Sequence, residues 1–473
     1  MLMVGRYLVD VFQTFFMLYF VGYMGYNMLF FAVAGIRIAS HRLRLLAAAR
    51  ETVDDVWTPP VSVIIPAYNE ETTIVHTVHS CLQSRYPVFE IIVVNDGSTD
   101  GTLDVLTEAF QLVPVVRPPK VRVPFRKVRA IYASRNTPRL LVVDKENGGR
   151  ADALNAGLAF SRYHLIACID ADSVVEPDSL LRCARPFADP RTVSAGGVVR
   201  VLNGCVVQGG RVTETGLPRN PLALMQAIEY TRAFFVHRPS IEALNALTLI
   251  SGAFGLFRRE VIAEAGGFSG KTAAEDMEMV LRLHHRYGWS GWRQAFVPDP
   301  VVWTEVPETL RDLAAQRRRW QRGLATTLWM YRHMVLRPRY GWLGLVVLPY
   351  YWLYELLEPV VVTMGYLFSG VSAVAGWIAF DAFAGLVMLP VSVNLVISFM
   401  ALIYGEVTFG RYQGMRDVLR LVFWTWTEPF WYRWLLVAWR LAGLWEALRG
   451  EQQWKKPKRN ATWARSSSTR LPA

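Results

Sequence analysis

The chain has 473 residues, 52% of them hydrophobic, and it contains 17 Trp and 24 Phe. This composition is richer in apolar residues than that of an ordinary soluble domain and indicates membrane residence. The formal net charge of +12 is compatible with binding to nucleic acid, to anionic lipid or to a phosphorylated substrate. Only the distribution of the charge along the chain can distinguish these partners. The four cysteines lie far apart without a CxxC pair, which argues against a disulfide framework or a zinc site.

The first predicted element is a transmembrane helix over residues 8–36. Residues 11–35 carry no charge, and a helix of this length extends about 37 Å, which is enough for a bilayer core. The run is too long for a cleavable signal peptide. Basic residues follow it closely: Arg37, His41, Arg42, Arg44 and Arg50. The positive-inside rule therefore predicts that the chain after the helix is cytoplasmic.

From about residue 59 to residue 339 the composition becomes that of a soluble domain. Residues 61–65 and 91–94 are predicted as buried strands, and residues 72–84 between them have helical spacing. A strand, a helix and a second strand joined by a right-handed crossover begin a doubly wound α/β sheet. Both strands end in polar loops, which therefore share one edge of the sheet.

A basic segment over residues 114–139 is predicted as a strand-rich connection, followed by a short strand over 140–143. Two glycines then precede a helix that begins near Arg150. Backbone N–H groups and a guanidinium at such a helix start can bind a phosphate. An ordinary loop with a helix start is the alternative.

The apolar run 165–169 ends in Asp170 and Asp172. In an open parallel sheet, ligands bind beyond the carboxyl ends of the strands. Two hard oxygen donors at this position suit Mg²⁺ or Mn²⁺ whose remaining ligands are waters and a substrate diphosphate. A solvated turn is the alternative, because Asp and Ser are common turn residues.

Six motifs occur in order along the chain: Pro66-Ala-Tyr-Asn-Glu70, Asn95-Asp-Gly-Ser98, Asn147-Gly-Gly-Arg150 with Ala153-Leu-Asn155, Asp170-Ala-Asp172, Glu275-Asp276 and Gln316-Arg-Arg-Arg-Trp320. In this order they resemble the membrane-embedded family 2 glycosyltransferases, which include cellulose, chitin, hyaluronan and poly-N-acetylglucosamine synthases. The resemblance covers residues 8–459. It implies a GT-A-like cytoplasmic α/β domain with a doubly wound, mostly parallel sheet, flanked by transmembrane and interfacial helices.

The resemblance implies a nucleotide site formed by Tyr68, Glu70, Asp96, Arg150 and Asp170. Asp96 would accept a hydrogen bond from a uracil ring, which a strand-end carboxylate can do chemically. Tyr68 and Glu70 would lie beside the base and the ribose. Relatives commonly carry Lys where this chain has Arg150, so the charge is kept but the geometry of a phosphate contact changes.

The resemblance implies that Asp276 is the general base that takes the proton of the acceptor hydroxyl, with Glu275 beside the acceptor. Relatives usually have Thr or Ser where this chain has Ala274. The alternative is that these carboxylates only cap a helix and stabilise its dipole, by about 0.3 to 1 kcal/mol. The small, apolar segment 248–257 resembles the family segment that lines the acceptor side.

A basic helix is predicted over residues 310–334, and most of its arginines suit a lipid surface. Gln316 and Trp320 are four residues apart and share one helical face, with Arg319 beside them. The resemblance implies that Gln316 and Arg319 contact the diphosphate and that Trp320 stacks under the acceptor sugar.

Apolar segments return over residues 342–368 and 383–404. Glu355 and Glu358 interrupt the first, and such glutamates either line a water-filled path or pair with arginines near the interface. Residues 417–448 mix Trp and Arg, which marks a membrane interface, and either cross the bilayer or lie in its plane.

The expected organisation is a transmembrane helix (8–36), a GT-A-like domain (56–305), amphipathic interfacial helices (306–340), transmembrane and interfacial helices (342–450) and a basic, disordered tail (451–473). We expect an inverting, processive, metal-dependent synthase in a bacterial inner membrane. It would transfer sugar from a UDP-sugar to a β-linked glycan acceptor, coupled to translocation, and its partners would be the lipid bilayer and accessory secretion proteins.

Two other functions remain open. A non-processive transferase that glycosylates a lipid would use the same motifs. A catalytically silent scaffold or a nucleic-acid-binding protein would fit the net charge, but the carboxylate set is intact and the arginines cluster at membrane flanks instead of on a separate basic domain. We therefore expect no nucleic acid partner.

Overall fold

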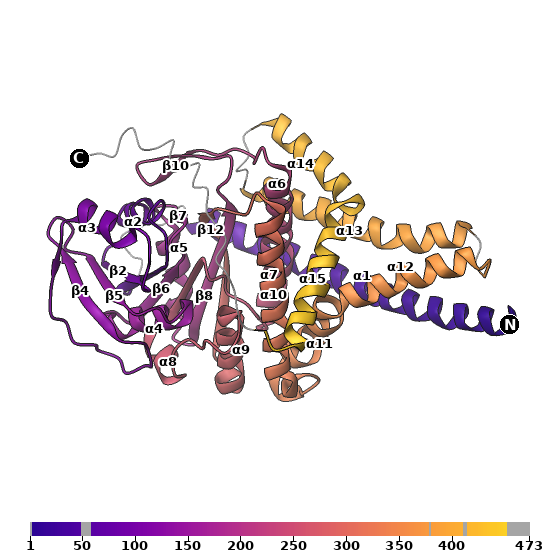
Figure 1. Ribbon diagram of the computed structural model, residues 1–473, viewed down its shortest axis with the longest axis horizontal. Helices are drawn as coiled ribbons and strands as arrows, with labels where there is room; N and C mark the ends of the chain where they lie inside the picture. The colour runs from indigo at the N-terminus through magenta and orange to yellow at the C-terminus, as the bar shows by residue number, and fades with distance from the viewer. Residues whose placement is uncertain (1, 49–57, 378–379, 410–413, 452–473) are drawn as a thin grey trace.

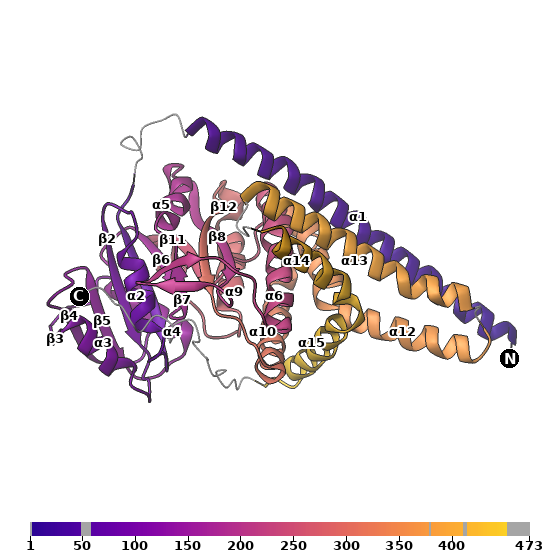
Figure 2. The ribbon, with the colours of Figure 1, turned by 90° about the horizontal axis from the view of Figure 1, so that it is seen from above.

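The computed structural model describes residues 2–48, 58–377, 380–409 and 414–451. An α/β unit forms one end of the molecule, and three long helices project together from the other end, as both views show (Figure 1, Figure 2). The predicted disordered tail, residues 451–473, lies almost entirely outside the described residues.

A mixed sheet of ten strands is the centre of the described α/β unit, in the order β3-β4-β5-β2-β1-β6-β11-β8-β12-β7. The strands are β1 (Val61–Ala67), β2 (Phe89–Asn95), β3 (Leu112–Pro114), β4 (Val128–Ser134), β5 (Leu140–Lys145), β6 (Leu165–Ile169), β7 (Ser173–Val175), β8 (Thr192–Val201), β11 (Phe254–Arg258) and β12 (Arg293–Thr304). The pairs β5-β2, β2-β1 and β1-β6 are parallel, whereas β11 runs antiparallel to both of its neighbours. The predicted α/β class is confirmed, and the parallel pairings are those of the run β5-β2-β1-β6 and of the pair β8-β12.

The central strands are apolar on both faces because helices cover both faces. Val63 and Ile65 of β1 belong to a core with α2 (Ile74–Leu82), α3 (Thr102–Phe110) and α5 (Ser179–Ala184). Ile64 points the other way, into the core that includes α4 (Arg150–Phe160). The predicted starts of β1 and β5 are confirmed, whereas β2 begins at Phe89, before the predicted residue 91, and β1 continues through Pro66 to Ala67.

Two expectations differ from the structure in this unit. The connection over 114–139 contains the edge strand pair β3-β4, but residues 115–127 between these strands are irregular. In the segment 248–257, only the part from Phe254 is a strand. The preceding residues turn at Ser251, where Phe254 N donates to the Ser251 carbonyl. This turn brings the Gly252 peptide to the sheet edge.

Helix α10 (Leu310–Met330) joins the α/β unit to the remaining helices. Thr309 caps it by accepting a hydrogen bond from Asp312 N at 3.2 Å. It packs against the loop before α9 (Glu275–Tyr287), where the Thr272 hydroxyl contacts the Gly323 carbonyl at 3.3 Å and the Thr327 hydroxyl at 2.9 Å. The predicted helix over 310–334 is thus confirmed as far as Met330, and the chain then turns.

The projecting helices are α1 (Leu2–Ala48), α12 (Glu358–Val374) and α13 (Phe380–Phe409) (Figure 2). Within the described residues, one helix is long and apolar enough to cross a bilayer alone, over Val9–Leu43, and a pair bent by 48°, Leu343–Leu356 with Glu358–Val374, would do so together. Length and composition alone support a membrane location only weakly, because buried core helices and signal sequences share them.

The predicted span over 342–368 is therefore broken. It starts with two π-helical segments, η7 (Leu343–Val347) and η8 (Tyr351–Leu356), before the bend into α12. Helices α14 (Met415–Thr427) and α15 (Tyr432–Leu448) are too short and too charged to satisfy the same criterion. Helix α15 instead packs along α10, where a Cβ on Gly443 would lie 2.6 Å from the Arg318 carbonyl oxygen.

The close packing of α10 leads to a prediction about Gly323. A Cβ at this position would lie 2.8 Å from the Ala274 Cβ and 3.0 Å from the Ala274 nitrogen, so α10 has to move away from α9 to accommodate it. We expect Gly323→Ala to lower transferase activity at least about tenfold, since an ångström of misplacement can cost about a hundredfold. The matched control is Gly370→Ala in α12, where a Cβ meets nothing within 4 Å. Equal activity of both variants in a radiolabelled-sugar assay would contradict this coupling.

Candidate active site

Most of the predicted site residues lie near the carboxyl ends of the parallel strands. Asp96 follows β2, and Asp170 follows β6, its neighbour but one in the sheet. Arg150 is the first residue of α4, and Glu275 and Asp276 open α9. The edge-of-sheet position expected for these side chains follows from the parallel order of β2, β1 and β6.

Arg150 is the centre of this cluster. Its Nη2 donates to Asp170 Oδ1 at 2.7 Å and to the Gly252 carbonyl at 2.7 Å, and its Nη1 donates to Glu275 Oε1 at 2.5 Å. Burial disfavours the charged guanidinium, but the carboxylates of Asp170 and Glu275 outweigh burial and raise the pKa of Arg150. The fork of one arginine therefore joins the end of β6 to the start of α9, a geometry that a lysine cannot reproduce.

Asp276 lies directly beside this cluster. Its two carboxylate oxygens accept hydrogen bonds from Gly252 N at 3.2 Å and from Met277 N at 2.9 Å. Burial and the neighbouring Glu275 charge raise the pKa of Asp276, whereas Arg150 and Arg319 oppose the shift. A carboxylate with a raised pKa is the kind of group that can accept a proton near neutral pH.

Helix α10 brings the predicted basic motif to the same place. Arg319 lies close enough to Glu275, Asp276 and Asp170 for these carboxylates to favour its charged form, although burial lowers the pKa of Arg319. Gln316 Oε1 is buried and has no hydrogen-bond partner among the described residues. Trp320 is 38% exposed, and the Arg317 guanidinium lies 4.5 Å from the centre of its ring.

The predicted nucleotide residues lie at the next strand ends. Asp96 is buried. Its carboxylate accepts hydrogen bonds from Lys145 Nζ at 2.5 Å, from Gly148 N at 3.0 Å and from Gly149 N at 2.8 Å. Tyr68 is half-exposed at the end of β1. The buried Glu70 accepts a hydrogen bond from the Thr73 hydroxyl at 3.0 Å, and the Glu70 amide donates to the Thr102 hydroxyl at 2.8 Å.

Sequence reasoning missed two groups in this cluster. Lys145 is fully buried and bridges Asp96 to Asp152, whose Oδ1 lies 2.6 Å from Nζ. A lysine at the end of the apolar run 140–143 was the available signal, because such a charge needs a buried carboxylate partner. The Gly252 peptide contacts both Arg150 and Asp276. No side-chain pattern could reveal a backbone contact of this kind.

Asp170 and Asp172 can be tested as ligands of the expected divalent ion. Asp172 is 2% exposed and accepts a hydrogen bond from the Thr304 hydroxyl at 3.2 Å, and Asp170 is partly exposed at the cluster. No group of three or more His, Cys, Asp or Glu arranged to hold a metal occurs among the described residues. The donor set fits Mg²⁺ or Mn²⁺ of the kind that keeps several waters and takes further ligands from a diphosphate.

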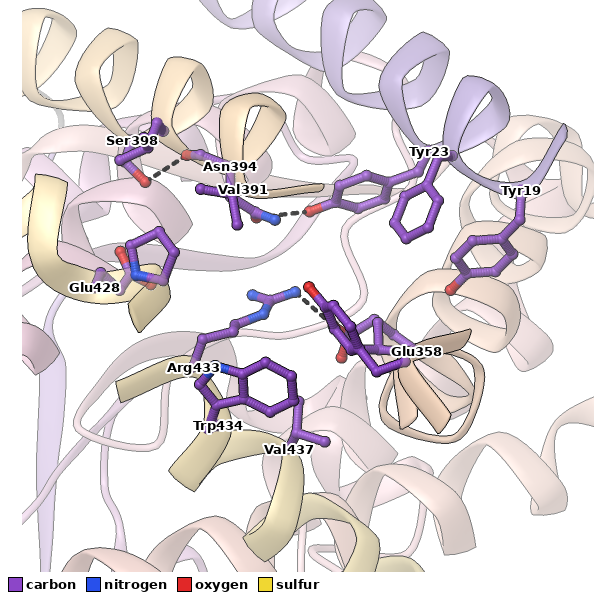
Figure 3. Close-up of a pocket in the computed structure, with 15 residues that line it drawn as sticks. Tyr19, Tyr23, Glu358, Val391, Asn394, Ser398, Glu428, Arg433, Trp434 and Val437 are labelled. Carbon is purple, nitrogen blue, oxygen red and sulfur yellow. Dashed lines mark hydrogen bonds and ion pairs between the residues drawn. The ribbon is translucent and has the colours of Figure 1, made fainter. Parts of the chain in front are cut away.

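A cavity lies between the helices beyond α10 (Figure 3). Its wall is aromatic, with Tyr19, Tyr23 and Trp434, and it contains an ion pair in which Arg433 Nη2 lies 2.5 Å from Glu358 Oε1. The Tyr23 hydroxyl donates to Asn394 Oδ1 at 3.3 Å. Glu358 also pairs with Arg440, at 2.8 Å. Pairing with arginines, one of the two alternatives for this glutamate, is therefore present, and the same pair lines a cavity.

Two family models match the chain. Residues 62–266 match the model described as glycosyl transferase family 2, and residues 165–396 match glycosyl transferase family group 2. Together they cover the site cluster and continue into α13. The fold, with parallel strands that end in the carboxylate motifs, agrees with both matches.

Curated relatives include poly-β-1,6-N-acetyl-D-glucosamine synthases. The one from Staphylococcus aureus (strain COL) is 29% identical over 265 residues, 56% of this chain and 54% of that protein. The one from Staphylococcus epidermidis is 27% identical over 285 residues, 60% of this chain and 58% of that protein. The chain thus matches a little over half the length of these relatives.

Among solved structures, the mannosyltransferase PcManGT from Pyrobaculum calidifontis, in complex with GDP-Man and Mn²⁺, has a TM-score of 0.54 with this chain. The match covers 91% of this chain and 99% of that protein at 18% sequence identity, which shows a shared fold. The motifs, the fold and the two family models agree that the chain contains a family 2 glycosyltransferase domain over residues 62–396.

Proposed function

We propose that the chain is an inverting, metal-dependent polysaccharide synthase that transfers sugar from a UDP-sugar to a β-linked glycan. The observation that carries the proposal is the docking of α10 on the loop before α9, with Arg319 of α10 near enough to Asp276 to feel its charge. This contact supports a single site in which the donor, the base Asp276 and the acceptor would meet. The similarity to poly-β-1,6-N-acetyl-D-glucosamine synthases supports a polysaccharide product.

The donor would bind along the strand ends. Asp96 would accept a hydrogen bond from the uracil ring, with Tyr68 and Glu70 beside the base and ribose. The donors that now contact Asp96, Lys145 and the Gly148 and Gly149 amides, fix its orientation. Arg150 and Arg319 would share the diphosphate, since both already lie among the carboxylates that face it.

Asp170 and Asp172 would hold the divalent ion, which when bound neutralises charge on the departing diphosphate. Gln316 and Arg319 would donate hydrogen bonds to the same leaving group from α10. Asp276 would take the proton of the acceptor hydroxyl, while the Gly252 and Met277 amides hold its carboxylate in place. Attack from the face opposite the diphosphate inverts the anomeric centre.

Helices α1, α12 and α13 would anchor the enzyme in a bacterial inner membrane with the α/β unit on the cytoplasmic side. Arg37 and His41, just beyond the apolar part of α1, are fixed to the α/β unit through Glu242 at 2.6 Å and Asp299 at 3.0 Å. Trp320 would stack under the chain end. The aromatic cavity in Figure 3 supplies rings and hydroxyls suited to a glycan that moves onward through the helices.

The metal assignment predicts the behaviour of Asp172→Asn. This variant keeps the side-chain shape but loses the charge that binds the cation, so transfer should fall at least about a hundredfold. Its metal-dependent UDP affinity should fall as well, which titration with Mg²⁺ and Mn²⁺ measures. Asp104→Asn, which changes an exposed aspartate in the first turn of α3, is the matched control. Full turnover in EDTA would contradict the assignment.

The base assignment separates binding from chemistry. Asp276→Asn should lower turnover at least about a hundredfold and leave UDP affinity within about twofold, since the group acts mainly in the transition state. Because the pKa of Asp276 is raised, kcat/KM of the wild type should decline with falling pH from a value above the ordinary aspartate range. An equal loss of UDP affinity and rate in the variant would instead make Asp276 a helix cap or a nucleotide ligand.

The proposed processive synthesis predicts that a change of Trp320 alters the length of the product. Loss of the stacking surface in Trp320→Ala should shorten the product more than it weakens UDP-sugar binding, because the ring would contact only the glycan. Size analysis of radiolabelled product is the measurement, with Trp329→Ala, another exposed tryptophan of α10, as control. A single sugar on a lipid under excess donor would favour the lipid-glycosylating alternative.

A further inference from the structure

A buried lysine lies directly behind the proposed nucleotide site. Lys145 is the last residue of β5 and is 0% exposed. Its Nζ lies 2.5 Å from Asp96 Oδ1 and 2.6 Å from Asp152 Oδ1, and it donates to the Glu146 carbonyl at 2.5 Å. An ammonium group has three N–H donors, and these three oxygens occupy all of them. Lys145 therefore has no donor left for a substrate, and any effect on the substrate passes through a carboxylate.

The Asp96 carboxylate has one acceptor position left. Its Oδ1 accepts hydrogen bonds from Lys145 Nζ and from Gly148 N, and its Oδ2 accepts one from Gly149 N. Each oxygen of an ionised carboxylate accepts about two hydrogen bonds. Among the described residues no further donor reaches this side chain, which is 4% exposed. A ligand thus meets Asp96 at a single position, on Oδ2.

The backbone on both sides of the carboxylate is held in place. The Asn147 side-chain amide donates to the Asp96 carbonyl at 2.8 Å. Gly97 has a φ of 67°, and a Cβ on it would lie 2.7 Å from the Asn147 nitrogen. The loop after β2 and the loop after β5 therefore fit together too closely for Asp96 to turn and present its other oxygen.

A single open acceptor on an anion distinguishes between nucleotide bases. Uracil presents one ring N–H between two carbonyl groups, so it needs one acceptor. Guanine presents two adjacent N–H donors, which pair best with both oxygens of a carboxylate, and Oδ1 of Asp96 is already filled by Lys145 and Gly148. The corresponding ring nitrogen of cytosine is itself an acceptor and needs a donor. The ionised form of Asp96 therefore fits uracil best.

Lys145 controls whether Asp96 is ionised. Burial raises the pKa of Asp96, and the hydrogen bond from Lys145 is the strongest of the contacts that oppose this shift, ahead of the Gly148 and Gly149 amides. The other charged group of the network, Asp152 of α4, lies on the opposite side of the ammonium and accepts from Arg126 N at 3.0 Å. A protonated Asp96 would donate a hydrogen bond, which suits cytosine and not uracil.

We propose that Lys145 is a positioning residue that sets the base preference of the donor site: it keeps Asp96 an anion with one acceptor position, on Oδ2, and so selects uracil over cytosine and guanine. The inference rests on the proposed function, in which Asp96 contacts the base. It assigns the choice of base to a lysine that does not touch the nucleotide.

The test measures the affinities of UDP, CDP and GDP for the full chain in detergent by titration calorimetry with Mg²⁺. The wild type should bind UDP at least about tenfold more tightly than CDP or GDP, the value of one charge-assisted hydrogen bond. Lys145→Met, which keeps the apolar stem and removes the charge, should lose most of the preference for UDP over CDP. Lys145→Arg keeps the charge and should retain part of it.

The pH dependence separates this role from a structural one. Without the lysine charge, the pKa of Asp96 moves further above the ordinary aspartate range. In Lys145→Met, UDP affinity should then rise and CDP affinity should fall as the pH increases through neutrality, because deprotonation of Asp96 restores the acceptor. Lys145→Gln keeps a hydrogen-bond donor without the charge. It should show the same opposite trends and is the second variant for the case that Lys145→Met does not fold.

The matched control is Asp152→Asn. It changes the other partner of the same ammonium and leaves the contact between Lys145 and Asp96 in place. Thermal stability should fall in this variant, but its preference for UDP over CDP should stay within about twofold of the wild-type value.

Three outcomes would overturn the inference. The first is a wild type that binds CDP or GDP as tightly as UDP. The second is a Lys145 variant in which UDP and CDP affinities fall by the same factor with parallel pH profiles, as expected for a purely structural lysine. The third is an equal loss of preference in Asp152→Asn. Failure of the proposed function looks different, because the wild type would then transfer no sugar from any nucleotide sugar.

Discussion

The ion pairs of Arg150 are the constraint on which the site depends. One guanidinium contacts a strand-end carboxylate, the first carboxylate of α9 and a loop carbonyl. The three partners are spread over residues 170–275 of the chain, and like-charged carboxylates brought together without a cation would repel one another. Removing the arginine would leave buried charges unpaired, which costs about 3 to 5 kcal/mol. The arginine therefore fixes the distance between the end of β6 and the start of α9.

A second constraint is the position of α10, which has two sets of contacts. Through Thr272 it touches the loop before α9. One residue after Trp320, the side chain of Gln321 accepts from Arg440 Nε at 3.0 Å and donates to the Leu356 carbonyl at 3.1 Å. Arg440 in turn contacts Glu358. The proposed catalytic groups and the helices that would lie in the membrane are thus joined by a short series of buried polar contacts.

The polar groups of these networks differ in whether they have a partner. Where arginines only join helices, as in the pairs Arg232–Glu428 and Arg433–Glu358, each has a carboxylate close by. On α10, by contrast, Gln316 Oε1 is buried without a hydrogen-bond partner among the described residues. A buried polar group without a partner and a carboxylate of raised pKa, such as Asp276, are both typical of functional sites.

The sequence alone determined the α/β class, the strands that end in carboxylates, the helix start at Arg150 and the identity of the family. It could do so because these features depend on local periodicity and on motifs that stay contiguous. The tertiary structure decided what those motifs contact. The contact of Lys145 with the Asp96 carboxylate and the contact of the Gly252 peptide with Asp276 depend on long-range packing. The break in the span before α12 depends on a bend that hydropathy does not register. Burial and pairing are properties of the folded chain, so no stretch of sequence carries them.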